Sequence, residues 1–158
     1  MGRAIRRGVE KWYACPLIAN MATPSRAEIT AGTEITESIA SISGFALTNS
    51  PVTTPDLGSR FDKTVAGIDS AGDSSLTMWD EVASGTGSDP ARAAMPKDAD
   101  KVIVRMPYGD TPGLRCEVWR VTVLGNNDQN DMAAAMQYQV GFSIRDVPTQ
   151  NAVVPALS

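Results

Sequence analysis

A mainly β fold, built from antiparallel strands arranged as a sandwich or a partly closed barrel, is predicted by three features of the 158-residue sequence. Stretches in which apolar and polar residues alternate recur along the chain, as expected for strands with one buried face. The 13 glycines and 10 prolines favour frequent turns and short helices. Only one segment carries a complete helix signal. A chain of this length is expected to form a single domain that buries roughly 70% of its unfolded surface.

Seven strand-like segments follow one another along the chain. They cover residues 12–19, 33–45, 60–68, 74–81, 101–108, 114–124 and 135–147. The sequences YGDTPG (108–113) and GNNDQND (125–131) have the composition of turns, so neighbouring strands are expected to form antiparallel hairpins. This number of short strands is typical of sandwiches and barrels.

The segment between the fourth and fifth strands predicts the one short helix, which we expect to flank the sheet. Ser88 or Asp89 is a suitable N-cap, and Pro90 is favoured at the first helical position. Pro96 then ends the helix. Its apolar stripe consists of Ala91, Ala94 and Met95.

In the sixth segment the apolar residues change phase. Leu114, Cys116 and Val118 share one parity, and the other parity is taken over by Trp119, Val121 and Val123. A shift of one residue moves side chains to the opposite face of a strand, which predicts a β-bulge or bend near 118–119. The alternative is a strand buried on both faces, one in the core and one against a partner.

The last segment, MQYQVGFSIRD (136–146), is the most regular. Its apolar residues, from Met136 to Ile144, fall on one face. The opposite face is polar but almost uncharged, with Arg145 near its edge, and it carries Gln137, Gln139, Gly141 and Ser143.

Three further segments lie outside these elements. Residues 1–11 form a basic N-terminal arm, which fits either a contact site or a solvated, mobile terminus. Residues 46–59 are expected to be an extended loop and residues 148–158 an extended tail. Both carry little charge, which favours docking on another subunit. The residues expected at such contacts are Pro51, Val52, Pro55, Leu57, Val153, Val154 and Leu157.

The composition excludes several kinds of chemistry. The absence of histidine removes the most common general base and most transition-metal sites. Cys15 and Cys116 are too few for a zinc site, and we expect buried thiols, although one long-range bridge is compatible with their number. No catalytic residue, metal site or cofactor is predicted. No window is apolar enough to span a membrane.

Four stretches together resemble the tail tube (major tail) proteins of long-tailed bacteriophages. They are SDPARAAM, RMPYGDTPGLRCEVWRVTVL, MQYQVGFSIRDVP and RFDKTVAGIDSAGDSSLTMWDE, so the likeness extends from about Lys11 to Pro148. It implies a non-enzymatic virion protein, assembled in the host bacterial cytoplasm, whose copies form hexameric rings with joined inner sheets. The rings stack into a passive conduit for DNA, and other tail proteins bind the tube ends.

A conduit for DNA needs a hydrophilic lumen without clustered basic residues. DNA carries about one negative charge per 1.7 Å, and rows of lysine or arginine would retain it. The chain has a net charge of −4, which suits such a channel. Gln137, Gln139 and Ser143 are candidates for the lumen face, although they fit the solvent side of an outer sheet equally well.

Two other classes of function remain open from the residues alone. One is a monomeric β-sandwich that binds carbohydrate or protein through its loops, with Trp79 or Tyr108 as contact residues. The other is an enzyme that uses two carboxylates, although no spacing of acidic residues singles out a pair.

Overall fold

The computed structural model describes residues 2–3, 5–81, 89–129 and 132–157. Ten strands, two short helices and one 3-10 turn lie within these residues. In chain order they are β1 (Lys11–Cys15), α1 (Arg26–Thr30), β2 (Thr33–Glu34), η1 (Thr36–Ser38), β3 (Ile39–Ser43), β4 (Leu47–Thr54), β5 (Lys63–Ala71), β6 (Ser74–Trp79), α2 (Pro90–Ala94), β7 (Asp100–Met106), β8 (Arg115–Gln129), β9 (Gln137–Ile144) and β10 (Thr149–Val153).

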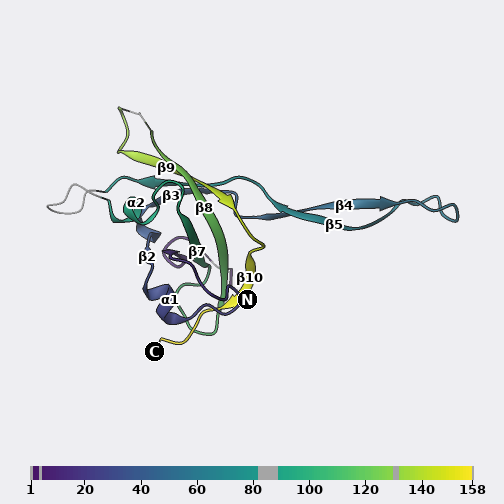
Figure 1. Ribbon diagram of the computed structural model, residues 1–158, viewed down its shortest axis with the longest axis horizontal. Coiled ribbons are helices and arrows are strands. Elements are labelled where there is room, and N and C mark those ends of the chain that lie inside the picture. The colour runs from purple at the N-terminus through teal and green to yellow at the C-terminus, as the bar shows by residue number, and fades with distance from the viewer. Residues whose placement is uncertain (1, 4, 82–88, 130–131, 158) are drawn as a thin grey trace.

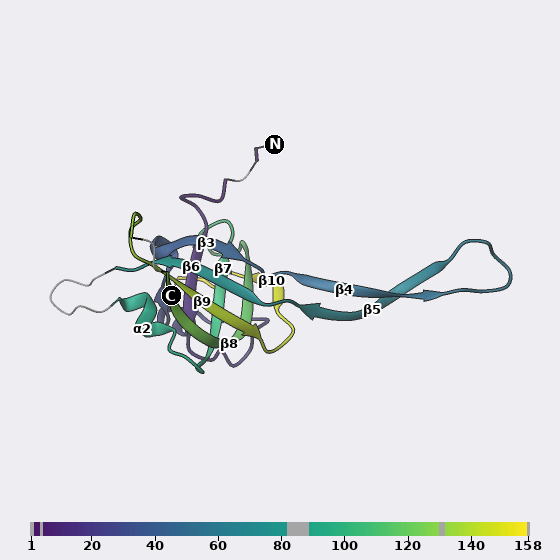
Figure 2. The same cartoon turned by 90° about the horizontal axis from the view of Figure 1, so that it is seen from above.

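Eight strands form one curved antiparallel sheet, which confirms the predicted fold class. The strand order is β2-β1-β7-β8-β9-β6-β3, and β10 pairs with the first part of β8. The sheet curls around a core without closing into a barrel (Figures 1 and 2). The other two strands, β4 and β5, form a separate hairpin that projects far from the body.

The main core lies on the inner side of the curl. Alternate residues of β6, β8 and β9 point into it, and Trp119, Tyr138 and Phe142 are fully buried there. Phe45 occupies its centre, with ring centroids 5.3 Å from Trp12, 5.7 Å from Trp119 and 5.8 Å from Phe142. Edge-to-face and tilted aromatic contacts of this kind add to the stability gained from burial.

Helix α2 packs against this core, as predicted. Asp89 is the N-cap, since its side chain accepts a hydrogen bond of 2.9 Å from the Ala91 amide, and Pro90 begins the helix. Ala91 and Met95 are buried in the core. The other candidate cap, Ser88, lies outside the described residues.

Helix α1 was not predicted from the sequence. Ser25 and Glu28 form a complete capping box around its first turn. The motif Ser-x-x-Glu is visible in the sequence and could have indicated this helix. The helix spans only five residues, which is too short for a helical apolar period to show.

The predicted bulge near 118–119 is wrong. Pairing of β8 with β7 is continuous from Glu117 to Thr122. The register shift opposite Val118 lies in the partner strand β10, between Thr149 and Ala152, and the one in the pairing with β9 lies further along, between Val123 and Gly125. The phase change instead reflects two buried faces. Trp119 belongs to the main core, whereas Val118 belongs to a second core on the opposite side of the sheet.

The chain itself covers this second core, so no partner is needed there. Ile18, Ile29 and Ala152 approach from the segment around α1 and from β10. The end of the chain is also fastened locally, because the guanidinium of Arg26 donates to the carbonyl oxygens of Pro155 (2.7 Å) and Ala156 (3.2 Å).

Three segments expected to be turn, loop or tail are strands. GNNDQND does not turn at its start, because β8 continues to Gln129. The expected loop 46–59 contains β4, and the expected tail 148–158 contains β10. β4 has no buried face, so its sequence lacks the apolar alternation that identifies a strand.

Both cysteines are free and buried, in agreement with the expectation of buried thiols. Burial raises the pKa of Cys15 to about 12 and that of Cys116 to about 11, with smaller contributions from nearby Glu28 and Glu117 respectively. The reactive thiolate is therefore scarce at pH 8.

We expect neither thiol to react with Ellman's reagent in the native protein at pH 8. Both should react readily after unfolding in guanidinium chloride, and the absorbance of the released thionitrobenzoate measures the reaction. Rapid labelling of either cysteine without denaturant would contradict this burial.

Candidate functional site

The outer side of the sheet opposite the main core carries an uncharged polar surface on β3, β6, β9 and the distal part of β8. We call it the polar face. The strand registers bring its residues into rows, for example Ser75 opposite Gly141 and Asn127 opposite Gln139. Its polar and glycine members are Ser41, Ser43, Ser75, Thr77, Thr122, Asn127, Gln129, Gln137, Gln139, Gly141 and Ser143. Two exposed apolar side chains lie among them, Trp79 opposite Gln137 and Leu124 beside Gly141.

The three residues predicted for the lumen lie together on this face. Gln139 is exposed, while Gln137 and Ser143 are half-buried. The Gln139 side-chain amide donates to the hydroxyl of Ser75 at 3.2 Å. Beside them the surface is hollowed by about 370 Å³, between Ser75, Asn127 and Gln139.

Asp73 lines the hollow beside Ser75, and the other charges near the polar face lie at its margins, where most of them are paired. Arg145 lies 3.5 Å from Asp100 and donates to the Thr122 hydroxyl at 3.1 Å. Asp128 points to the other side of β8 and pairs with Arg92 at 2.7 Å. The middle of the face therefore presents mainly hydroxyl and amide groups, together with Leu124, and carries no lysine or arginine among the described residues.

The sheet has two free edges on either side of this face. Among the described residues, β3 pairs with β6 alone. Pairing between β7 and β8 ends at Thr122, so residues 124–129 of β8 pair only with β9 within the same part of the chain. Unpaired backbone N–H and C=O groups along such edges can accept a strand from another molecule.

The β4–β5 hairpin, with its connecting tip at residues 55–62, forms a projecting arm (Figure 1). Leu47 pairs with Ala71 at its base and Thr54 with Lys63 near its tip. An isolated two-stranded ribbon is marginally stable in water. Its exposed apolar side chains are Val52, Leu57, Phe61, Val65 and Ile68.

The arm contains four of the residues expected at subunit contacts. Pro51 and Val52 lie on β4, and Pro55 and Leu57 lie at the tip. All four are exposed.

The other three expected contact residues lie near the C-terminus, and they differ from one another. Val153 and Leu157 are exposed, whereas Val154 is buried in the second core of its own chain. Its backbone is fixed there as well, because its amide donates to the Leu114 carbonyl (2.8 Å) and its carbonyl accepts from the Gly113 amide (3.0 Å). The expectation that Val154 is available to a neighbour is therefore corrected.

The basic N-terminal arm is anchored at Glu10. This buried carboxylate contacts Arg6 (3.1 Å) and Arg105 (2.7 Å) and accepts a hydrogen bond of 2.8 Å from the Trp12 indole. Arg105 in turn lies 3.3 Å from Glu117. The described residues before Glu10 are exposed.

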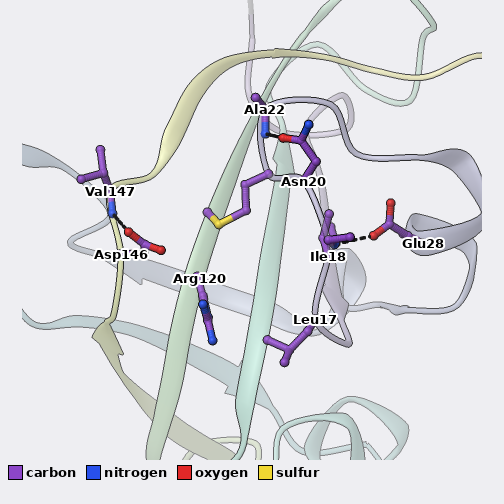
Figure 3. A pocket seen from close by; sticks show the side chains of 10 residues that line it. Leu17, Ile18, Asn20, Ala22, Glu28, Arg120, Asp146 and Val147 are labelled. Carbon is purple, nitrogen blue, oxygen red and sulfur yellow. Dashed lines mark hydrogen bonds between the residues drawn. The ribbon is translucent and has the colours of Figure 1, made fainter.

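A pocket of about 630 Å³ lies beside Arg120 (Figure 3). On β8, Arg120 lies between Val118 of the second core and Thr122 of the polar face. Arg120 projects into it from β8, between the segment of Leu17 and Ile18 on one side and Asp146 and Val147 on the other. We call it the Arg120 pocket. No single strand predicts it, because its lining residues come from three distant parts of the sequence.

A family model described as "Phage tail tube protein" matches residues 1–157. A search of curated protein sequences gives no match. Within the described residues, no helix is long and apolar enough to cross a membrane.

Two solved structures resemble the fold. One is a chain in the 6-fold symmetrised cryo-EM structure of the anti-feeding prophage baseplate. It has 11% sequence identity and a TM-score of 0.61, and the match covers 95% of this chain and 98% of that chain. The other is a chain in the tail of an empty GTA particle, computed with helical refinement and C6 symmetry. It has 9% identity and a TM-score of 0.48, over 77% of this chain and 87% of that chain.

Proposed function

This chain belongs to the phage tail tube protein family, and we propose that six copies form a ring and that rings stack into a tube for double-stranded DNA. The family is structural and non-enzymatic, and its members are components of the virion tail. The 6-fold symmetry of the similar baseplate assembly supports six copies per ring. Assembly in the host cytoplasm, before the tail joins the virion, is part of this proposal.

The uncharged polar face is the observation that carries the proposal. A tube must let DNA pass without holding it, and binding to DNA is built mainly from lysine and arginine. The polar face has neither, and its hydroxyl and amide groups keep the surface wet. We therefore assign this face, including Gln137, Gln139 and Ser143, to the lumen. DNA passes it without specific binding.

Ring closure follows from the two free edges. When the β3 edge of one copy pairs with the distal β8 edge of the next, the strands β3, β6, β9 and β8 of all copies join into one continuous barrel. Main-chain hydrogen bonds then satisfy the exposed edges, which would favour aggregation in a monomer. The polar face becomes the inner wall of this barrel.

The arm and the exposed ends of the chain provide further contacts between copies. Val52, Leu57 and the other exposed apolar residues of the arm gain from burial against a neighbour. The N-terminal arm and the exposed residues Val153 and Leu157 are suited to the same role. Other tail proteins bind the tube where no further copy follows.

Negative-stain electron microscopy of purified protein over a concentration series, with light scattering on the same samples, tests the proposal. We expect rings or tubes with a central hole. A strict monomer at every concentration, also after addition of preformed tail ends, would favour the monomeric binding module with Trp79 or Tyr108 as contact residues.

Lysines in the lumen are expected to slow the passage of DNA. We expect the double substitution Gln137→Lys with Gln139→Lys to leave tubes intact, since both side chains point away from the core. Counterion release then makes the wall retain DNA, with an ejection half-time longer by roughly tenfold at low salt and by less at high salt. Time-resolved fluorescence of ejected DNA measures the rate.

The control for this substitution is Thr111→Lys, which adds a positive charge at an exposed turn outside the polar face. We expect it to leave ejection unchanged. Unchanged ejection in the double lysine variant would place the polar face outside the lumen.

A further inference from the structure

We propose that the Arg120 pocket is the receptor for the arm tip of a second copy, in which Asp62 pairs with Arg120. The inference rests on the proposed function, because it names the residues through which assembled copies hold one another. It concerns a side-chain contact that is separate from the polar face and from the free strand edges.

The first observation is a positive charge without a partner. Arg120 is half-buried, and its Nε atom is fully buried without a hydrogen bond. Within the described residues no carboxylate lies within 4.0 Å of its guanidinium, since no ion pair joins Arg120 to Asp146 or Glu28, although both line the same pocket. A buried Nε–H group without an acceptor is costly, so a carboxylate oxygen from outside the chain would be favoured here.

The second observation is the mixed character of the pocket. Ile18 and Met21 form an apolar side, and Leu17 and Val147 are exposed at its rim, by 54% and 72% respectively. Asp146 adds a negative charge at the same rim. A volume of about 630 Å³ lies in the range that holds a ligand of drug size, and two or three protein side chains occupy a similar space.

The arm tip offers complementary groups. Leu57 and Phe61 are exposed by 109% and 75%. Asp56 is already engaged by Lys63 at 3.2 Å. Asp62, in contrast, has no ion pair among the described residues, and neither has Arg60. The tip therefore presents one free carboxylate, one free guanidinium and two apolar side chains.

These groups match the pocket one by one. Asp62 supplies the missing carboxylate for Arg120, and Arg60 faces Asp146 at the rim. Leu57 and Phe61 cover the apolar side. A bidentate pair between arginine and carboxylate in a partly buried site is a strong and geometrically specific contact.

The tip that fills the pocket belongs to another copy. The arm points away from the body in both views (Figures 1 and 2). β4 has eight residues, which at about 3.3 Å per residue carries the tip roughly 26 Å beyond the arm's base. The pocket lies on the body, beside the segment 146–147, so a chain cannot reach it with its own tip.

Charge reversal tests the pair. We expect Arg120→Glu and Asp62→Arg each to raise the protein concentration needed for tube assembly by at least tenfold. The double variant, which restores opposite charges, should return to within about threefold of wild type. Lys97→Glu, at an exposed lysine without an ion pair among the described residues, is the matched control and should assemble like wild type. Circular dichroism and thermal unfolding establish that each monomer is folded.

A second measurement does not depend on charge reversal being tolerated. In the variant Arg120→Lys, carbodiimide should couple the new amine to Asp62 of another copy, and mass spectrometry should find the joined peptides. Mixing isotope-labelled and unlabelled protein shows that the link is intermolecular. If the protein assembles without this link, or if the Arg120→Glu variant assembles like wild type, the pocket proposal is overturned and the proposed tube function still stands. A wild-type chain that forms neither rings nor links overturns both.

Discussion

Replacement of residues 48–70 by Asn-Gly is expected to give a folded monomer that no longer assembles into tubes. Leu47 and Ala71 are directly paired at the base of the arm, and a two-residue Asn-Gly turn closes such a pair with the correct strand twist. The removed segment contributes no residue to either buried core cluster. We therefore expect its loss to change the melting temperature by only a few degrees.

The loss of assembly should be complete under conditions in which wild type forms tubes. Electron microscopy measures the tubes, and sedimentation velocity measures the remaining species. The matched control keeps the arm and replaces one of its cross-strand pairs, Thr48→Ala with Ser70→Ala. We expect the control to assemble. Tubes of normal length from the shortened chain would show that the arm is dispensable.

Phe45→Ala should cause a large loss of stability, about 3–5 kcal/mol in the free energy of unfolding. Phe45 is 4% exposed and contacts Trp12, Trp119 and Phe142. Its removal leaves a cavity that no neighbouring side chain can fill without leaving its own contacts. Its φ of 57° is uncommon for a non-glycine residue. Alanine has the same Cβ atom, so the substitution does not relieve this backbone strain.

Urea denaturation of the monomer, followed by tryptophan fluorescence, measures this effect. Phe61→Ala is the control, because Phe61 is 75% exposed at the arm tip. We expect it to change the stability of the monomer by less than about 0.5 kcal/mol. A loss below about 1 kcal/mol for Phe45→Ala would mean that the aromatic cluster is not a tightly packed centre.

The parts of the fold that the sequence predicts well are those with one buried face. Strand β9 alternates between polar and apolar residues along its whole length, and α2 begins with Asp89 and Pro90. In both cases a local pattern reflects a local cause. The phase change in β8 is visible in the sequence, but its cause is non-local. The second core is covered by Ile18 and Ile29, more than 80 positions earlier in the chain, and by Ala152, which follows β8.

The arm is difficult to predict for the opposite reason. Val52 and Val65 are paired across it, yet neither is buried, so no alternation marks β4 as a strand. Pro51 and Pro55 further suggest a loop. The side of β9 that bears Gln137 and Gln139 follows from alternation, whereas the pocket around Arg120 exists only after three separate segments fold together.

The arm leaves the body in one direction only, and this gives an assembly of such chains a polarity. If the tip of one copy binds the body of another, the contact is heterologous, because each copy offers an arm on one side and a receptor on the other. Such a contact does not pair two copies off with each other, so further copies can always be added. A growing tube then always ends in unused arms at one end and unoccupied receptors at the other. These two ends are chemically different, so a protein that initiates the tube and a protein that caps it can each bind selectively to one end.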